Sequence, residues 1–207
     1  KRPKQVETPF MSLEAVLETV HAGEAAGCQE ALLTLGEKPE LRYRAAKDWL
    51  TEQGYASTVD YVVAACKTIL KHSGLLPHVN AGTLSLAELR ALKPYIASMG
   101  IMLESGSRDL ITKGGAHYGS PDKIPTRRLA TLARAGRLAI PTTTGLLIGI
   151  GERAEQRVAD LKAIARLHKR YGHIQEVIIQ NFRAKPETLM RDSADADCDE
   201  LRRTVAL

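Results

Sequence analysis

Polar residues immediately follow several apolar runs in the 207-residue sequence, at positions where their side chains could bind a ligand. Glu104 follows the run MGIML, and Glu152 follows TTTGLLIGIG, which holds three glycines in seven residues. A carboxylate in such a place can accept hydrogen bonds from an ammonium group or from ribose hydroxyls. The glycines allow a ligand or a neighbouring strand to approach the backbone closely. Both glutamates are therefore candidate binding residues.

Each of these signals also has a plainer structural interpretation. Glu152 could cap the helix that follows it, and Glu104 could belong to an ion pair at the edge of a sheet. Arg128, on the next predicted helix, has the donor geometry that binds a carboxylate in bidentate fashion, but a solvated helix arginine is the simpler interpretation. The glycines do not have the GxGxxG register of a dinucleotide site. The residues alone leave both interpretations open.

Two further segments combine hydrogen-bond donors and acceptors. The loop GGAHYGSPDK, at 114–123, has the composition of a functional loop, although a mobile surface loop would look similar. The segment QNFRAKP offers donors for an anionic or polyhydroxylated substrate, and an ordinary polar strand end is the competing interpretation. The candidate side chains in these two segments are His117, Tyr118, Asp122, Lys123, Gln180, Asn181 and Arg183.

The elements that would position these residues alternate along the chain. Hydrophobic periodicity predicts helices at 12–27, 41–53, 58–72, 127–137 and 154–171. Short apolar runs predict strands at 30–36, 75–82, 98–105, 141–151 and 173–182. Ser85 and Glu88 have the spacing of a capping box, which predicts another helix start.

Short apolar strands separated by helices are typical of parallel β/α units, in a doubly wound sheet or in a (β/α) barrel. Polar or glycine residues follow all five predicted strands, and functional residues in (β/α) barrels collect at that rim. The sequence therefore favours a barrel, and five strands indicate a partial one.

Composition and charge narrow the class of protein further. A length of 207 residues with 44% hydrophobic content is enough for one core and too short for two ordinary domains with a linker, which predicts one globular unit. No apolar run approaches the roughly 18 residues of a membrane span, and KRPKQVETPF does not resemble a signal peptide, so we expect a soluble, cytoplasmic protein. The net charge of +5 is spread over helices and aromatic residues are scarce, which favours solvated helix faces over a nucleic-acid surface.

Several segments together resemble a family of radical S-adenosylmethionine (SAM) enzymes, the 7,8-didemethyl-8-hydroxy-5-deazariboflavin synthases, in subunit 1 or the N-terminal half of the fused form. The segments are GCQEALLTLGEKPELRY, GLLPHVNAGTLS, SMGIMLES, GGAHYGSPDK, TTGLLIGIGE and HIQEVIIQNFRAKPETLM. GGAHYGSPDK and HIQEVIIQNFRAKP are specific to this group, whereas GLLIGIGE is similar to the GxIxGxxE motif of radical SAM enzymes at large. A sister radical SAM enzyme, such as the adduct-forming subunit 2 or a menaquinone-pathway relative, and a non-catalytic SAM-pocket module are the alternatives.

The resemblance implies a partial (β/α)6 barrel and a radical SAM lyase. Such an enzyme converts a tyrosine-derived adduct of a ribityl-substituted diaminouracil into the deazaflavin chromophore of coenzyme F-420 and releases ammonia. A 4Fe-4S cluster cleaves SAM, with 5'-deoxyadenosine and methionine as co-products. The implied partners are the small-molecule substrate, the adduct-forming subunit 2 or a fused second domain, and an electron donor, with no nucleic acid and no membrane.

The resemblance also implies roles for individual residues. Gly36 and Glu37 match the motif that meets the SAM amino group, Glu104 the position that holds the ribose or amine, and Arg128 the position that binds the SAM carboxylate. The segment with Gly149, Gly151 and Glu152 would lie beside the adenine. The residues implied on the substrate side are Asn80, His117, Tyr118, Asp122, Lys123, Gln180, Asn181 and Arg183.

One departure concerns the cluster. The family binds it through CxxxCxxC, a motif that would precede Lys1 and is absent from this sequence. Cys28, Cys66 and Cys198 are too far apart to replace that motif or to suggest another metal site, and each is most simply a reduced thiol. The resemblance therefore implies a chain truncated at both ends that is inactive by itself.

Overall fold

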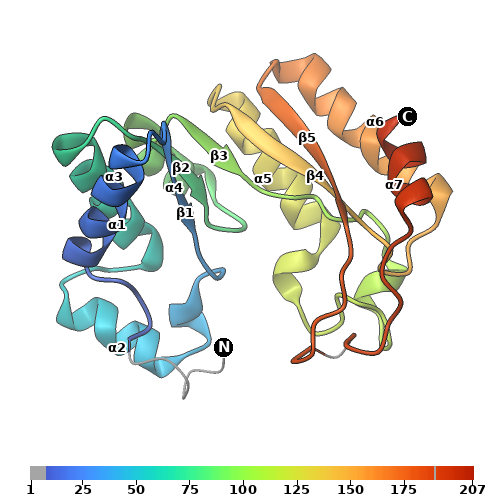
Figure 1. Cartoon of the computed structure of the whole chain (residues 1–207), viewed down its shortest axis with the longest axis horizontal. Helices are drawn as coiled ribbons and strands as arrows, with labels where there is room; N and C mark the ends of the chain where they lie inside the picture. The colour runs from blue at the N-terminus through green and yellow to red at the C-terminus, as the bar shows by residue number, and fades with distance from the viewer. Residues whose placement is uncertain (1–7, 189) are drawn as a thin grey trace. The chain divides into compact units, whose positions relative to one another are not determined.

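The structure, a computed structural model, describes residues 8–188 and 190–207. The segment KRPKQVETPF, which we do not expect to be a signal peptide, lies mostly outside the described residues, because these begin at position 8. The chain forms two compact units, unit 1 at 1–100 and unit 2 at 101–207 (Figure 1). The organisation as one functional domain stays a prediction.

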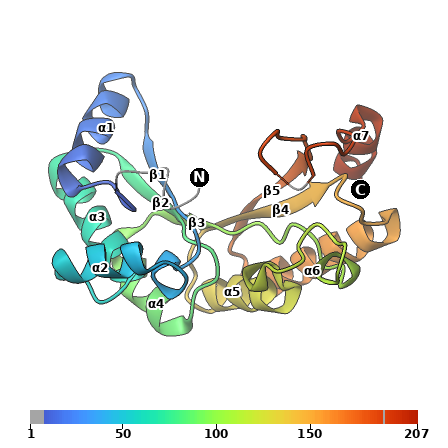
Figure 2. The ribbon, with the colours of Figure 1, turned by 90° about the horizontal axis from the view of Figure 1, so that it is seen from below.

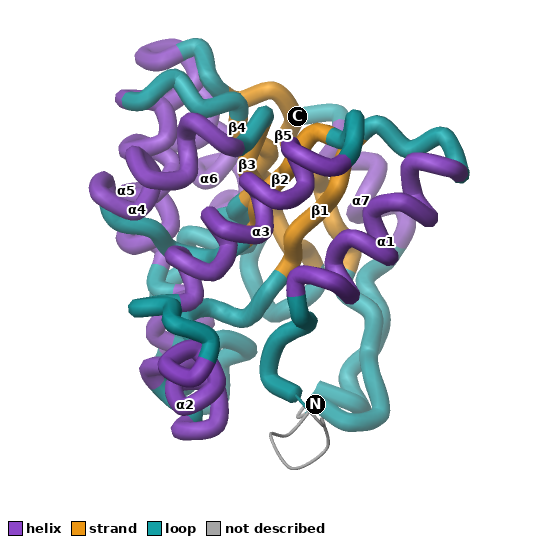
Figure 3. Tube along the Cα trace, turned by 90° about the vertical axis from the view of Figure 1, so that its left-hand side faces the viewer, coloured by secondary structure: helices purple, strands orange, loops and turns teal. Residues whose placement is uncertain are grey.

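The described residues of unit 1, from position 8 onward, form three parallel strands and four α-helices. β1 (Glu30–Thr34) pairs with β2 (Leu76–Asn80), and β2 pairs with β3 (Ser98–Gly100). The helices are α1 (Leu13–Ala25), α2 (Arg44–Glu52), α3 (Thr58–His72) and α4 (Leu86–Leu92), with 3-10 turns at Pro39–Leu41 and Lys93–Tyr95. Helices α1 and α3 lie together on one side of β1 and β2 (Figure 3). Val79 and Met99 are fully buried, as expected for strands covered by helices.

Three helices of unit 1 begin at serine side chains. The hydroxyl of Ser12 accepts a hydrogen bond from the Ala15 amide, and that of Ser57 accepts one from the Asp60 amide. At α4 the Glu88 amide donates to Ser85 Oγ at 3.2 Å, and the Ser85 amide donates to the Glu88 carboxylate at 2.6 Å. The predicted capping box is confirmed.

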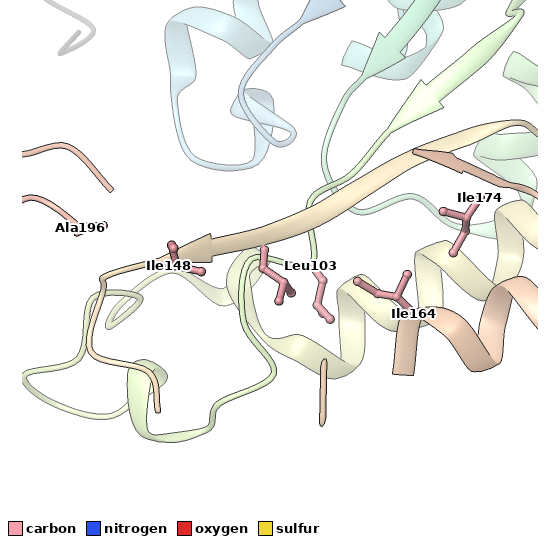
Figure 4. Close-up of a cluster of buried hydrophobic side chains, with 6 residues drawn as sticks. Leu103, Ile148, Ile164, Ile174 and Ala196 are labelled. Carbon is pink, nitrogen blue, oxygen red and sulfur yellow. The ribbon is translucent and has the colours of Figure 1, made fainter. Parts of the chain in front are cut away.

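Unit 2 contains a parallel pair of strands, β4 (Thr142–Ile148) and β5 (Ile174–Asn181). Its helices are α5 (Pro125–Arg137), α6 (Ala154–Tyr171) and α7 (Cys198–Val205), with 3-10 turns at Asp109–Ile111 and Pro121–Lys123. Figure 2 shows α5 and α6 on one face of the two strands. A cluster of buried aliphatic side chains forms the core of this unit (Figure 4), namely Leu103, Leu146, Ile148, Ile164, Ile174 and Ala196.

The predicted strand at 98–105 is only partly a regular strand. β3 ends at Gly100, and the chain then runs beside β4 through separate hydrogen bonds. The Glu104 amide donates to the Gly145 carbonyl at 2.9 Å, and the Leu147 amide donates to the Glu104 carbonyl at 2.9 Å. Glu104 has φ +63°, and this left-handed backbone interrupts the extended conformation.

The structure shows the state of the three cysteines, and whether its described residues include membrane-spanning helices or grouped metal ligands. All three cysteines are free, with Cys28 and Cys198 exposed and Cys66 buried, as expected for reduced thiols. Burial raises the pKa of Cys66 to about 12, so this thiol stays protonated at neutral pH. Within 8–188 and 190–207, no helix is long and apolar enough to cross a membrane, and no three His, Cys, Asp or Glu side chains are grouped as metal ligands.

Gly145 of β4 must be a glycine, because a Cβ there would overlap the carbonyl oxygen of Ile178 on β5. Replacing Gly145 with Ala should therefore force the strands apart and lower the free energy of unfolding by about 2 kcal/mol. Urea unfolding followed by circular dichroism measures this. Gly23→Ala, within α1, is the matched control, because its added methyl meets only Leu75 and Cys28 at ordinary van der Waals distances and should stabilise the protein by up to about 1 kcal/mol. Equal effects of the two substitutions would contradict the packing argument.

Candidate active site

Glu104 lies at the centre of a cluster of charged and polar side chains within unit 2. Its carboxylate is 3.0 Å from His117 Nε2 and 3.4 Å from Arg128 Nη1, and it accepts a hydrogen bond from Lys123 Nζ. The Glu104 side chain is only 13% exposed. Four residues that the sequence singled out in three different segments are thus brought together, and the ion-pair interpretation of Glu104 is correct.

The Glu104 carboxylate is ionised in the folded protein. Burial is the largest single influence and raises its pKa, but the His117 hydrogen bond and the charges of Lys123 and Arg128 together lower the pKa from 4.5 to about 2. The two cations outnumber the one carboxylate, so the cluster carries excess positive charge. Such a cluster can receive an anionic group beside Lys123, which keeps 29% of its side chain exposed.

Arg128 is a buried side chain, which excludes the solvated helix arginine considered from the sequence. Its Nε donates to the Asp122 carbonyl at 3.0 Å, and its Nη1 donates to the Met102 carbonyl. α5 begins with Pro125 at its first position, which is favourable there because the first turn needs no amide donor. Arg128 in the next turn is thereby fixed against the segment that carries Glu104.

The loop at 114–123 supplies His117 and Lys123 to this cluster. The His117 amide donates to the Leu110 carbonyl at 2.8 Å, and a Cβ on Gly115 would overlap that same carbonyl. His117 Nδ1 is buried and has no hydrogen-bond partner among the described residues. A buried polar atom without a partner is uncommon and marks a place where a bound group can contribute. Tyr118 is exposed.

Glu152 closes the turn at the end of β4. One carboxylate oxygen accepts the Gly149 amide at 3.0 Å, and the other accepts the Ile150 amide at 2.9 Å. Arg157 Nε lies 2.9 Å from the same carboxylate as an ion pair, although its N–H is not directed at the oxygen. The Glu152 carboxylate therefore organises its own turn and not the start of α6, whose N-cap residue is Arg153, so the prediction that Glu152 caps the following helix is wrong.

The glycines of this turn have local structural reasons. Gly149 and Gly151 have φ +86° and +102°, which glycine adopts without steric cost. A Cβ on Gly149 would also lie 2.5 Å from the Cβ of Ala196, so this neighbouring segment occupies the space that the glycine leaves. Contact of this turn with an adenine stays a prediction.

The predicted residues of unit 1 lie where β1 and β2 end. Glu37 accepts hydrogen bonds from the Thr83 amide, at 3.0 Å, and from the Thr83 hydroxyl. Gly82, at φ +73°, leaves room for this carboxylate, because a Cβ there would lie 2.6 Å from Glu37 Oε2. Gly36 has open space where a side chain would be, and Asn80 is half-buried. Glu37 therefore connects the two strand ends, and its contact with a SAM amine stays a prediction.

The remaining candidates lie at the end of β5. Arg183 is exposed and pairs with Asp195 at 2.9 Å, and the Ala184 amide donates to the same carboxylate at 2.8 Å. These contacts fix the segment that follows the strand. Gln180 is exposed and Asn181 is half-buried, opposite Leu147 and Ile148 of β4. None of these three contacts the Glu104 cluster through an interaction seen among the described residues.

The sequence reasoning missed two buried ionisable residues of α6. Asp160 accepts a hydrogen bond from the Gly106 amide at 2.8 Å, and burial raises its pKa. Arg157 binds Glu152, and it also donates to Thr204 at 3.1 Å and to Glu200. Both lie on the buried face of α6 with Ile164. The helical spacing that places them on the same face as the apolar residues could have predicted their burial from the sequence.

Glu104→Gln should destabilise the protein by about 3 kcal/mol at neutral pH, because it leaves Lys123 and Arg128 without their buried counter-charge. The pKa of Glu104 is lowered by folding, so its contribution is complete above pH 4.5 and is lost as the pH falls toward about 2. Urea unfolding at several pH values should show the difference between wild type and variant shrinking over that range. Glu176→Gln, on an exposed position of β5, is the control and should have little effect at any pH.

Comparisons with known proteins place this geometry in context. No family model matches the chain. The sequence is 52% identical over 204 residues to FO synthase of Mycobacterium tuberculosis, covering 98% of this chain and 24% of that protein. It is 48% identical over 206 residues to 7,8-didemethyl-8-hydroxy-5-deazariboflavin synthase of Methanopyrus kandleri, covering 100% of this chain and 62% of that protein. The chain thus spans about a quarter of the first and less than two thirds of the second.

Solved structures share the fold at low sequence identity. HydG, a maturase of the [FeFe]-hydrogenase, matches 99% of this chain with a TM-score of 0.76 and 17% identity. Methylornithine synthase (PylB) matches 95% of it with a TM-score of 0.71 and 18% identity. The predicted fold class, α/β with a partial (β/α) barrel, is confirmed. At about 50% identity over nearly its whole length, the chain corresponds to one segment of the longer FO and 7,8-didemethyl-8-hydroxy-5-deazariboflavin synthases.

Proposed function

We propose that this chain forms the SAM-binding part of a radical SAM enzyme that makes a deazaflavin. The reaction is the lyase step, in which the tyrosine-derived adduct of a ribityl-substituted diaminouracil closes its ring and loses ammonia. The observation that carries the proposal is the cluster of Glu104, His117, Lys123 and Arg128, in a chain about half identical to FO synthases. SAM with its 4Fe-4S cluster supplies the 5'-deoxyadenosyl radical when both are bound.

The Glu104 cluster has the charges that suit the amino-acid end of SAM. The ionised Glu104 can accept hydrogen bonds from an ammonium group or from ribose hydroxyls. Lys123 and Arg128 offer positive charge to a carboxylate, and Arg128 is held in place by two backbone carbonyls. The buried Nδ1 of His117, which has no partner in the described part of the chain, is a further position for a bound group. The residues present therefore fit the methionyl part of SAM.

The 4Fe-4S cluster needs ligands other than these. Among the described residues there is no grouped set of three metal-binding side chains, so no step of the reaction is assigned to a cluster held by this segment. The longer relatives are consistent with further parts of the enzyme, and we propose as partners an adduct-forming subunit or fused domain and an electron donor.

The test uses the natural protein that carries this chain, reconstituted anaerobically with iron and sulfide and then reduced with SAM and the adduct-forming partner present. We expect 5'-deoxyadenosine and a fluorescent deazaflavin to appear together. Deoxyadenosine without deazaflavin would assign the chain to a sister radical SAM reaction. If a cluster-loaded protein formed neither product, it would act as a non-catalytic module, and the proposal would be wrong.

Arg128→Lys should weaken SAM binding at least tenfold in the cluster-loaded protein. Lysine keeps the charge but lacks the planar guanidinium group. In Arg128 that group donates to the Met102 and Asp122 carbonyls and can at the same time bind a carboxylate. Equilibrium binding of SAM measures the effect. Arg127→Lys is the matched control, because Arg127 is the exposed neighbour on the same helix and should bind SAM as wild type does. An equal loss in both variants would remove Arg128 from the proposed site.

A further inference from the structure

The three strands of unit 1 have two different faces. Pro77, Val79 and Met99 are buried on the face that α1 and α3 cover. Side chains alternate along a strand, and the pairing of the strands is in register, so the intervening residues share the opposite face. We call this the polar face of unit 1, and its members are Glu30, Leu32, Thr34, Leu76, His78, Asn80, Ser98 and Gly100.

His78 is the central residue of the polar face. Its Nδ1 is 2.7 Å from Ser98 Oγ, and Ser98 is itself only 6% exposed. A hydrogen bond to a buried hydroxyl on the neighbouring strand fixes the plane of the imidazole ring. Nδ1 is thereby used within the protein, and Nε2 is the nitrogen that remains for a ligand.

Nε2 of His78 lies over Gly100, where the backbone has no side chain. A Cβ on Gly100 would be 2.9 Å from His78 Nε2 and 3.6 Å from Asn80 Nδ2. Two polar side-chain ends therefore converge above the same bare stretch of β3. In the described part of the chain no hydrogen-bond partner is seen for His78 Nε2, whereas Nδ1 has one. A convergence of unused polar groups over bare backbone is what a small-molecule site requires.

The character of these groups indicates the class of ligand. The polar face includes no Lys or Arg, and its one carboxylate, Glu30, lies at the start of β1, away from Asn80 at the end of β2. Glu37, near the ends of the same strands, is already occupied by Thr83. A carboxamide offers both donors and an acceptor, and an imidazole offers one directed hydrogen bond. The face therefore suits an uncharged ligand with adjacent donors and acceptors, and it lacks the cations that a phosphate or carboxylate would need.

We propose that His78, oriented by Ser98, and Asn80 bind the uncharged part of the enzyme's substrate through its cyclic amide ring or its polyhydroxyl chain. This rests on the proposed function, in which the substrate contains a ribityl-substituted uracil. His78 and Asn80 are binding residues, and Ser98 is a positioning residue that acts through the His78 ring. Gly100 leaves the space in which a ring can lie against the backbone.

The test is isothermal calorimetry on the natural protein with 6-(ribitylamino)uracil, a neutral probe, and separately with uracil and with ribitol. His78→Leu should weaken binding of the probe about tenfold, the loss of one hydrogen bond. His78→Gln should recover part of that affinity, because its amide can still donate. Gly100→Ala should weaken binding as well, since the added methyl would displace Nε2. The comparison of uracil with ribitol shows which part of the probe is bound.

Two controls separate binding from folding. His72→Gln, an exposed histidine at the end of α3, should bind the probe as wild type does. The affinity of the cluster-loaded protein for SAM should be unchanged in all His78 variants. If wild type does not bind the probe, or if His78→Leu and Gly100→Ala bind it normally, the inference is wrong. Failure of wild type to form 5'-deoxyadenosine is a different result, because it contradicts the proposed reaction and leaves the binding measurement intact.

Discussion

The ionised carboxylate of Glu104 is the constraint around which the candidate site of unit 2 is built. It is buried, so it requires counter-charges, and these come from two separate elements, the loop at 114–123 and helix α5. Satisfying one carboxylate therefore fixes the path of a long irregular segment and the start of a helix. The backbone of Glu104 is also tied to β4 by two hydrogen bonds, which anchors the cluster to the core.

Other polar groups of the site serve mainly to hold the backbone in shape. Glu152 binds the amides of its own turn, and Glu37 binds the amide and hydroxyl of Thr83. In each case a short segment that lacks regular hydrogen bonds receives them from a carboxylate. Such preorganised turns at the ends of parallel strands leave backbone and a few side chains available to a ligand, which is how the rim of a barrel serves binding.

The two proposed binding regions differ in their chemistry. The Glu104 cluster is charged and has more cations than anions, which suits the amino-acid end of SAM. The polar face of unit 1 has neutral hydrogen-bonding groups around His78, which suit the uncharged part of the proposed substrate. An enzyme that must hold a charged cofactor and a neutral heterocycle benefits from this difference, because each region disfavours the other ligand.

Much of the fold could be predicted from the sequence, because hydrophobic periodicity and capping residues act over only a few positions. The five strands, the main helices and the capping box at Ser85 follow from such local patterns. Glu104 and Arg128 could be chosen as candidate binding residues, because Glu104 follows a predicted strand and Arg128 lies on the next predicted helix. Whether Glu152 bound its own turn or faced a ligand depended on how the turn at Gly149 and Ile150 folds, which the residue types alone leave open. Whether Arg128 was buried or solvated depended on its contact with Met102, 26 positions away.

The sequence by itself therefore determined the order and type of the elements and the residues at the strand ends. Only the tertiary structure decided which side chains meet. His117 and Lys123 reach Glu104 across 13 and 19 positions, and His78 reaches Ser98 across 20. A local pattern carries no information about such pairs, because the hydrogen bonds and the burial that join them exist only once the chain has folded.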